Sequence, residues 1–202
     1  MIVMNIRQKA FLIDLLEGVP SIAFLIFLRN EAGLELAGWI GSLAALLAFA
    51  ALYLLNCKSH PVLLGVNLHL LFATPVIIGI DYAGATQLAS FLASHAHKGV
   101  LLTVCIVGVL ETMFMAGGFV GAPDLPKKTI TKYSRMMLVV GLTGVCWAFG
   151  TEASAFIAVL VSLTAMIGLR NFLLARWQDN NSGAAALFIG LPISGHGSET
   201  AV

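Results

Sequence analysis

The stretch GWIGSLAALLAFAAL, Gly38 to Leu52, contains no charged residue and consists almost entirely of apolar and small side chains. The apolar run around it, Glu35 to Leu55, has the length of about 20 residues that an α-helix needs to cross the hydrocarbon core of a bilayer. Lipid offers the backbone no hydrogen-bond partners, so a run of this kind must satisfy them internally, as a helix does. The stretch therefore predicts a transmembrane helix.

The whole chain has the composition of an integral membrane protein. Of its 202 residues, 59% are hydrophobic and only 10% are charged, far from the balance of a soluble domain. Lysine plus arginine nearly equals aspartate plus glutamate, so no basic surface indicates nucleic-acid binding. The partner that this composition predicts is the lipid bilayer.

The other apolar runs predict an all-α bundle of six transmembrane helices. The expected spans are Ala10–Leu28, Glu35–Leu55, Val62–Ile80, Val100–Val120, Tyr133–Gly150 and Ala153–Leu174. If the N-terminus is inside, nine of the eleven basic residues fall in inner segments, and the positive-inside rule then places both termini in the cytoplasm. Residues 1–176 are thus expected to form one six-helix domain.

Two segments outside the spans carry apolar residues of their own. Between the third and fourth spans, Leu88, Phe91, Leu92 and His95 recur at helical spacing, which predicts a short amphipathic helix on the outer membrane surface. Residues 177–202 are expected to be a cytoplasmic tail that breaks in a polar stretch. Its short apolar segment, Ala184–Leu191, would then dock against the bundle or another subunit.

The first span, which includes LIDLLEGVPSIAFLIF (Leu12 to Phe27), carries two carboxylates. Asp14, Glu17 and Ser21 recur at spacings of three and four, so they share one helix face in the cytoplasmic half of the bilayer. Gly18 and Pro20 are expected to kink the helix just beyond them. This polar face is interpreted as a cytoplasmic inlet, and the alternative is a solvated helix end without a function of its own.

Glu111 lies near the middle of the expected fourth span, where an ionised acid is costly. On the third span Asn67 and His69 fall within about two turns of the same depth, and His69 is the expected hydrogen-bond partner of Glu111. Such a pair is either a structural hydrogen bond or the core of a proton relay. Gly117 and Gly121 form a GxxxG pair that predicts close helix contact on the same span.

Signals for metal binding and catalysis are weak. His95 and His97 form an HxH that, with Asp81, would make a loose metal site at the outer surface, and the alternative is a solvated histidine pair. The sequence contains no HExxH, GxSxG, Walker A, zinc-cysteine or dinucleotide-binding motif. No cofactor is therefore expected, and an intramembrane metal-dependent enzyme is only a remote possibility.

The second span has small residues four apart: Gly38 with Ser42, Gly41 with Ala45, and Ala44 with Ala48. Small residues at this spacing let helices approach closely. The face they form is expected to pack inside the bundle, or else against another membrane subunit or a second copy of the chain.

The first third of the chain resembles the bacterial intracellular septation protein A family and its longer inner-membrane relatives. The resemblance rests on Asp14, Leu15, Pro20 and the Phe24–Phe27 run, followed by a short polar link and a small-residue helix. It implies a multi-pass protein of the bacterial cytoplasmic membrane, associated with envelope synthesis and division and without established enzymatic chemistry.

Two functions follow as hypotheses. The first is a transporter-like or channel-like protein, either proton-coupled or solute-sensing, with Glu111, His69 and Asn67 in its core. The second is a non-catalytic membrane subunit or scaffold of a larger envelope complex, which the absence of reaction motifs favours.

Overall fold

The computed structural model describes residues 16–24, 26, 34–55, 59–151 and 155–189, and all regular structure within them is helical. A short helix over residues 16–24 comes first. The later helices are α2 (Leu34–Leu54), α3 (Pro61–Tyr82), α4 (Thr86–Phe114), α5 (Lys127–Gly150) and α6 (Ala155–Ile189).

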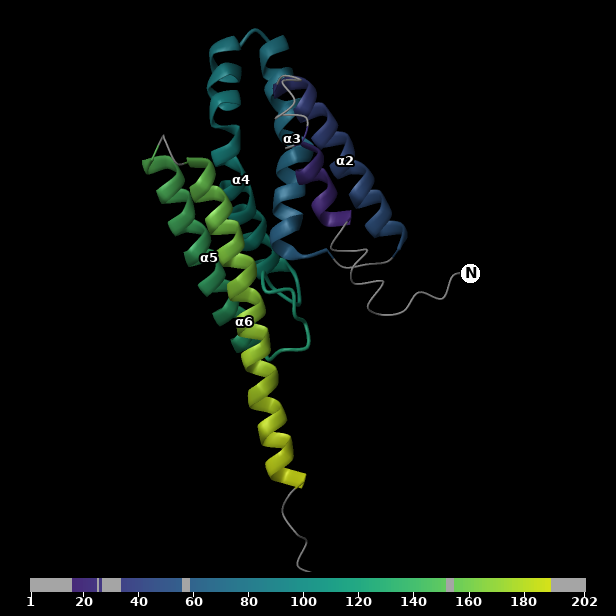
Figure 1. Cartoon of the computed structure of the whole chain (residues 1–202), viewed down its shortest axis with the longest axis vertical. Helices are drawn as coiled ribbons and strands as arrows, with labels where there is room; N and C mark the ends of the chain where they lie inside the picture. Colours follow the sequence, from purple (N-terminus) through teal and green to yellow (C-terminus); the bar gives the residue numbers. More distant parts are fainter. Residues whose placement is uncertain (1–15, 25, 27–33, 56–58, 152–154, 190–202) are drawn as a thin grey trace, which may run out of the picture.

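Consecutive helices pack side by side, with the α3–α4 hairpin at the centre (Figure 1). Helix α2 packs against α3, α5 packs against α4, and α6 packs against α5 and also touches α4. At the top of Figure 1 the α3–α4 hairpin extends beyond α5 and α6, and at the bottom α6 projects beyond all the other helices. The molecule is therefore elongated along the helix axes.

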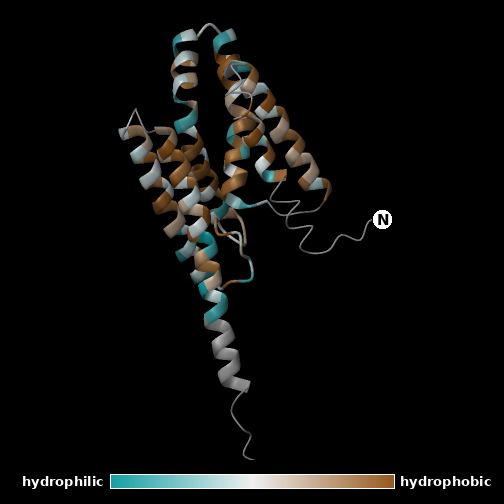
Figure 2. Ribbon diagram, viewed as in Figure 1, coloured by the Kyte–Doolittle hydropathy of each residue, from teal (hydrophilic) through white to brown (hydrophobic). Residues whose placement is uncertain are grey.

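Within the described residues, five helices are long and apolar enough to cross a membrane: Glu35–Leu54, Pro61–Tyr82, Thr86–Phe114, Lys127–Gly150 and Ala155–Asp179. Hydrophobic residues cover most of their length (Figure 2). Large apolar side chains such as Leu43, Leu47 and Val139 point outward, whereas small ones such as Ala45 and Ala48 are buried. An apolar exterior of this extent suits lipid rather than water. The chain is a multi-pass helical membrane protein.

The expected second and third spans are confirmed to within two residues, but the fourth differs at both ends. Helix α4 already begins at Thr86, so the separate surface helix predicted around Leu88 to His95 was wrong: these residues are the first turns of α4. The segment from Thr86 to Lys98 contains no proline or glycine that would interrupt a helix. Extending a helix that has already formed costs little, so the two expected helices are one.

Helix α4 also ends earlier than expected, at Phe114. Gly118 and Gly121 have positive φ values of 56° and 68°, a conformation that glycine adopts without steric cost. Gly117 and Gly121 therefore lie in the turns after α4 and not on a helix face, and their interpretation as a helix-packing pair was wrong. The loop that follows is largely apolar and returns to the core, where Phe119 and Val120 are fully buried.

Helix α6 is longer than the sixth expected span. It continues through the polar stretch around Asp179 to Ile189, so the predicted break after Trp177 is not formed. The physical reason is again that propagating a long helix through weak helix formers costs little. Most of the segment expected to dock, Ala184–Leu191, is the end of α6, which projects away from the bundle in Figure 1.

The first expected span is described only in part. Residues 16–24 are helical, whereas Asp14 and the flanks of this span lie outside the described residues. Pro20 is buried within the short helix, and a kink at Gly18 and Pro20 stays a prediction. That the first expected span crosses the membrane, which would bring the number of spans to six, and that both termini lie in the cytoplasm also remain predictions.

The small-residue face of α2 is used inside the bundle. Gly38 lies against Thr74 of α3, and a Cβ atom at Gly41 would lie 3.2 Å from Cβ of Phe24. The hydroxyl of Ser42 donates a hydrogen bond of 2.9 Å to the carbonyl of Leu71. This face therefore packs against other helices of the bundle, which is the first of the two arrangements expected for it.

Candidate functional site

Glu17 anchors a buried group of polar side chains at the N-terminal end of α3. Its side chain is fully buried, and its Oε1 accepts a hydrogen bond of 2.6 Å from the backbone N–H of His60. His60 is the N-cap residue of α3, so the carboxylate lies where the helix dipole favours negative charge. This contact joins the first helix to α3.

Asn67, two turns into α3, makes the second connection. Its Nδ2 donates a hydrogen bond of 3.1 Å to the backbone carbonyl of Glu17, and the Asn67 side chain is fully buried. Its Oδ1 is buried and makes no hydrogen bond within the described part of the chain. Asn67 therefore retains one unused acceptor beside the Glu17 backbone.

Arg170 of α6 links this group to the other half of the bundle. Its Nε donates a hydrogen bond of 2.9 Å to the carbonyl of Val120 in the loop after α4. Its guanidinium interacts electrostatically with the carboxylates of both Glu17 and Glu111. One guanidinium thus interacts with two carboxylates that come from different helices.

Glu111 lies in the last turn of α4, because the helix ends at Phe114. Its expected position near the middle of the fourth helix was therefore wrong, and it sits at the same end of the bundle as Glu17. Its Oε2 is buried and has no hydrogen-bond partner among the described residues. We call Glu17, His60, Asn67, Glu111 and Arg170 the polar centre.

The imidazole of His60 is held neutral by its surroundings. Burial and the positive charge of Arg170 lower its pKa to about 4. Both of its ring nitrogens are buried without a hydrogen-bond partner in the described residues. At neutral pH the ring therefore brings hydrogen-bonding capacity, but no charge, to the polar centre.

His69 does not join Glu111, contrary to prediction. Its Nδ1 lies 3.0 Å from the hydroxyl of Thr103, which itself donates to the carbonyl of Gly99. Residues two apart on a helix point in nearly opposite directions, which is why Asn67 enters the polar centre and His69 does not.

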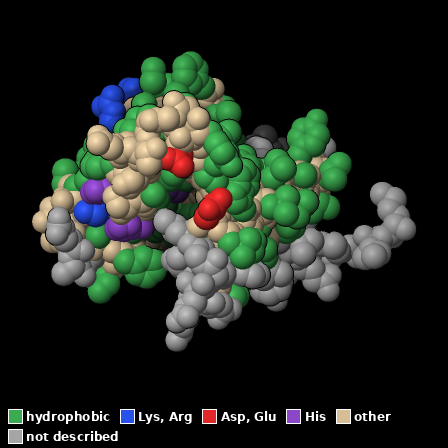
Figure 3. Space-filling view, turned by 90° about the horizontal axis from the view of Figure 1, so that it is seen from above, with side chains coloured by type: hydrophobic (Ala, Val, Ile, Leu, Met, Phe, Trp, Pro, Cys, Tyr) green, Lys and Arg blue, Asp and Glu red, His purple; other side chains and the backbone are tan. Residues whose placement is uncertain are grey.

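His69 instead lines a cavity of about 470 Å³ between α2, α3 and α4. A second cavity, of about 330 Å³, shares Thr74, Ile77 and Ala93 with it and is also lined by Glu35 and Asp81. Seen from the end where the α3–α4 hairpin projects, acidic and histidine side chains interrupt a mainly hydrophobic surface (Figure 3). The two cavities adjoin and extend from this end towards His69.

The three residues expected to hold a metal are not brought together. His95 packs on the ring of Phe91 with centroids 4.4 Å apart, whereas His97 and Asp81 line different cavities. Within the described part of the chain, no group of three or more His, Cys, Asp or Glu side chains has metal-binding geometry. The HxH spacing turns the two histidines to different sides of α4.

Among the residues of the predicted inlet, Glu17 is in the polar centre and Ser21 is half-buried one turn further along. Sequence reasoning missed His60 and Arg170. Two signals were present: His60 precedes Pro61, a favoured first residue of a helix, and Arg170 is a cation inside the expected sixth span.

The chain matches no protein-family model, no curated protein and no solved structure. The fold and the site therefore define the class of protein as a multi-pass helical membrane protein with a polar centre at one end and adjoining cavities at the other.

Proposed function

We propose that this protein moves protons, either alone or coupled to a small polar solute, across the membrane. The observation that carries the proposal is a set of buried polar atoms in and beside the polar centre that have no hydrogen-bond partner among the described residues. They are the hydroxyl of Ser59, both ring nitrogens of His60, Oδ1 of Asn67 and Oε2 of Glu111. Buried polar groups are nearly always hydrogen-bonded, so a cluster of exceptions favours a site that water or a solute enters.

The charges suggest which group exchanges a proton. The single guanidinium of Arg170 can neutralise only one of the two carboxylates with which it interacts. Glu17 is tied to the N-terminus of α3, whereas Glu111 keeps an unpaired oxygen at the end of α4. Glu111 is therefore the proposed proton-exchanging residue.

The two cavities form the part of the proposed proton path that lies towards the hairpin end of the bundle. They extend from the hairpin end to His69, which lies two residues from Asn67 on α3. Leu70 lines the cavity of about 470 Å³ and belongs to the hydrophobic core. Val66 and Val104 belong to the same core. These apolar side chains are the proposed barrier between cavity and polar centre, and transport requires a conformation in which they part.

The test is proton flux into proteoliposomes under an imposed potassium-diffusion potential, read with an internal pH dye. We expect wild-type protein to accelerate flux above that of protein-free liposomes, and Glu111→Gln and His69→Ala each to lower it at least about tenfold, because each removes a titratable group. The matched control is Asp124→Asn, an exposed acid in the loop after α4, which should retain the wild-type rate.

Glu111→Asp separates loss of function from loss of folding, since it keeps a carboxyl group and should keep measurable flux. Unchanged flux in both Glu111→Gln and His69→Ala would refute the proposal, as would wild-type flux no faster than that of protein-free liposomes.

A second candidate function is a non-catalytic subunit or scaffold of a larger envelope complex, which agrees with the resemblance of the first third of the chain. The observation that favours it is the outer face of α2, where Leu36, Trp39, Leu43, Leu46 and Leu47 are all exposed. Their size and density suit a partner helix as well as lipid. Purification in mild detergent tests this: a chain that always elutes alone contradicts the subunit function.

A further inference from the structure

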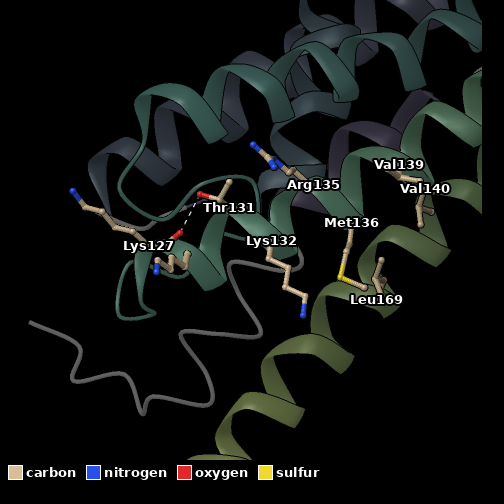
Figure 4. A pocket seen from close by; sticks show the side chains of 9 residues that line it. Lys127, Thr131, Lys132, Arg135, Met136, Val139, Val140 and Leu169 are labelled. Carbon is tan, nitrogen blue, oxygen red and sulfur yellow. Dashed lines mark hydrogen bonds between the residues drawn. The ribbon is translucent and has the colours of Figure 1, made fainter.

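The first four turns of α5 and Leu169 of α6 line a groove of about 880 Å³ (Figure 4). Four basic residues line it: Lys127, Lys128, Lys132 and Arg135. All four side chains are exposed, and none forms an ion pair with an acidic residue of the described chain. Helix α5 contains no acidic residue of its own. The groove is therefore a concentration of positive charge that no acidic side chain of the described residues neutralises.

The basic residues are arranged on one helix face. Lys128, Lys132, Arg135 and Val139 are spaced by four, three and four residues, so their side chains follow one stripe along α5. From Lys128 to Arg135 the stripe is cationic over about 10 Å of helix axis. The separate positive charges repel one another, and an anion bound between them removes that repulsion.

Directly after Arg135 the groove becomes apolar. Met136 and Val139 of α5 continue it, and Leu169 of α6 forms its facing wall, as Figure 4 shows. Within about one helical turn the lining thus changes from cationic to hydrocarbon. A bilayer changes in the same order and over a similar distance, from phosphate headgroups to acyl chains.

We propose that this groove binds an anionic phospholipid from the surrounding membrane. The phosphate lies between Lys132 and Arg135, where Arg135 donates paired hydrogen bonds and Lys132 adds a point charge. An acyl chain lies along Met136, Val139 and Leu169. An acidic peptide or free phosphate would bind the basic side chains but leave the apolar wall of the groove uncovered. A lipid contacts both parts and therefore fits best. This site is independent of the proposed transport path.

Native mass spectrometry of the full chain in detergent, titrated with phosphatidylglycerol or phosphatidylcholine, tests the proposal. We expect a saturable preference for phosphatidylglycerol. Because each basic group near the surface contributes about 1 kcal/mol, Lys132→Gln and Arg135→Gln should each weaken binding about fivefold, and together about 25-fold. The matched control is Arg176→Gln, an exposed cation on α6 outside the groove, which should bind as wild type does.

Two further arms distinguish a lipid from its headgroup alone. Val139→Ser should weaken phosphatidylglycerol binding while leaving the charges in place, and soluble glycerol phosphate should fail to displace the lipid. Lys132→Arg, which keeps the charge, should retain binding and so exclude a folding defect. Equal binding of both lipids, displacement by glycerol phosphate at lipid concentrations, or full retention in the double variant would each overturn the proposal.

Discussion

Two glutamates in similar local sequences, LLEG at Glu17 and VLET at Glu111, have different roles because their surroundings differ. Glu17 is fully buried and accepts the N–H that begins α3, so its carboxylate fixes the packing of the first helix. Glu111 lies at the end of α4 with an unpaired buried oxygen. Arg170 acts on both, so the chemistry of this end of the bundle depends on one cation that sequence reasoning had counted only as a topology signal.

Because of His60, the folding stability is expected to fall as the pH falls. Its pKa is about 4 in the folded chain against an ordinary 6.5, so between these values the unfolded chain binds more protons and folding stability falls as pH falls. At pH 7 the effect is absent, and at pH 4.5 we expect a loss of about 2.5 kcal/mol from this residue. The measurement is chemical unfolding in detergent at both pH values.

The His60→Asn variant should lose less stability than wild type over this pH range, because asparagine does not titrate and is accepted at a helix N-cap. His95→Asn is the control, since it removes a histidine near the start of α4, at the other end of the bundle from Arg170. An identical pH dependence in wild type and His60→Asn would contradict the assignment.

At the scale of helices, the ends and the contacts decide which residues meet. The end of α4 at Phe114 moves Glu111 from mid-span to the level of the polar centre, and the continuation of α4 back to Thr86 places His97 on a cavity wall. Helices α3 and α4 lie close together because Gly65 presents no side chain to Val104. A Cβ atom at Gly65 would lie only 2.7 Å from Cα of Val104.

Gly65→Ala should therefore force α3 and α4 apart and destabilise the fold by about 1 to 3 kcal/mol. Gly79→Ala, on the same helix, is the matched control because nothing lies within 4 Å of the added Cβ atom. Alanine also favours a helix more than glycine does, so this control should be neutral or slightly stabilising. Thermal unfolding of the two variants in the same detergent compares them, and equal midpoints would disprove close packing at Gly65.

At the scale of the whole molecule, the two ends of the bundle differ. One end carries the polar centre, the basic groove and the loop after α4, and the other carries the α3–α4 turn with the adjoining cavities. The excess of basic residues at the first end predicts that it faces the cytoplasm. With this orientation the cavities of the proposed transport path would open to the outside and the polar centre to the cytoplasm.

Cysteine labelling tests this orientation. In a background with Cys57, Cys105 and Cys146 replaced by serine, Gln87→Cys at the start of α4 should react with a membrane-impermeant maleimide in intact cells. Asp124→Cys, in the loop after α4, should react only after permeabilisation. Both native side chains are exposed, so accessibility to the reagent depends on the side of the membrane. The reverse labelling pattern would invert the predicted topology.

Much of the fold could be predicted because hydropathy and length are local properties. The spans α2 and α3 were located from composition alone, since a bilayer requires about 20 apolar residues in a row. The ends of α4 could not be located in this way, because an amphipathic segment and a membrane span can form one continuous helix. In the polar centre Glu17, Asn67 and Glu111 were named as candidates, but their grouping with His60 and Arg170 was not foreseen, because it joins residues far apart in sequence.

Composition and the lengths of the apolar runs are enough to establish a multi-pass helical membrane protein and to single out the polar residues that are costly in lipid. The packing of the helices shows that Asn67 meets Glu17, that His69 meets Thr103, and that Arg170 interacts with two carboxylates. The energy of placing a residue in lipid depends only on the type of residue and its depth, so it can be read from the sequence. Which side chain that residue contacts depends on helix rotation, helix ends and close packing, and the apolar pattern does not specify these.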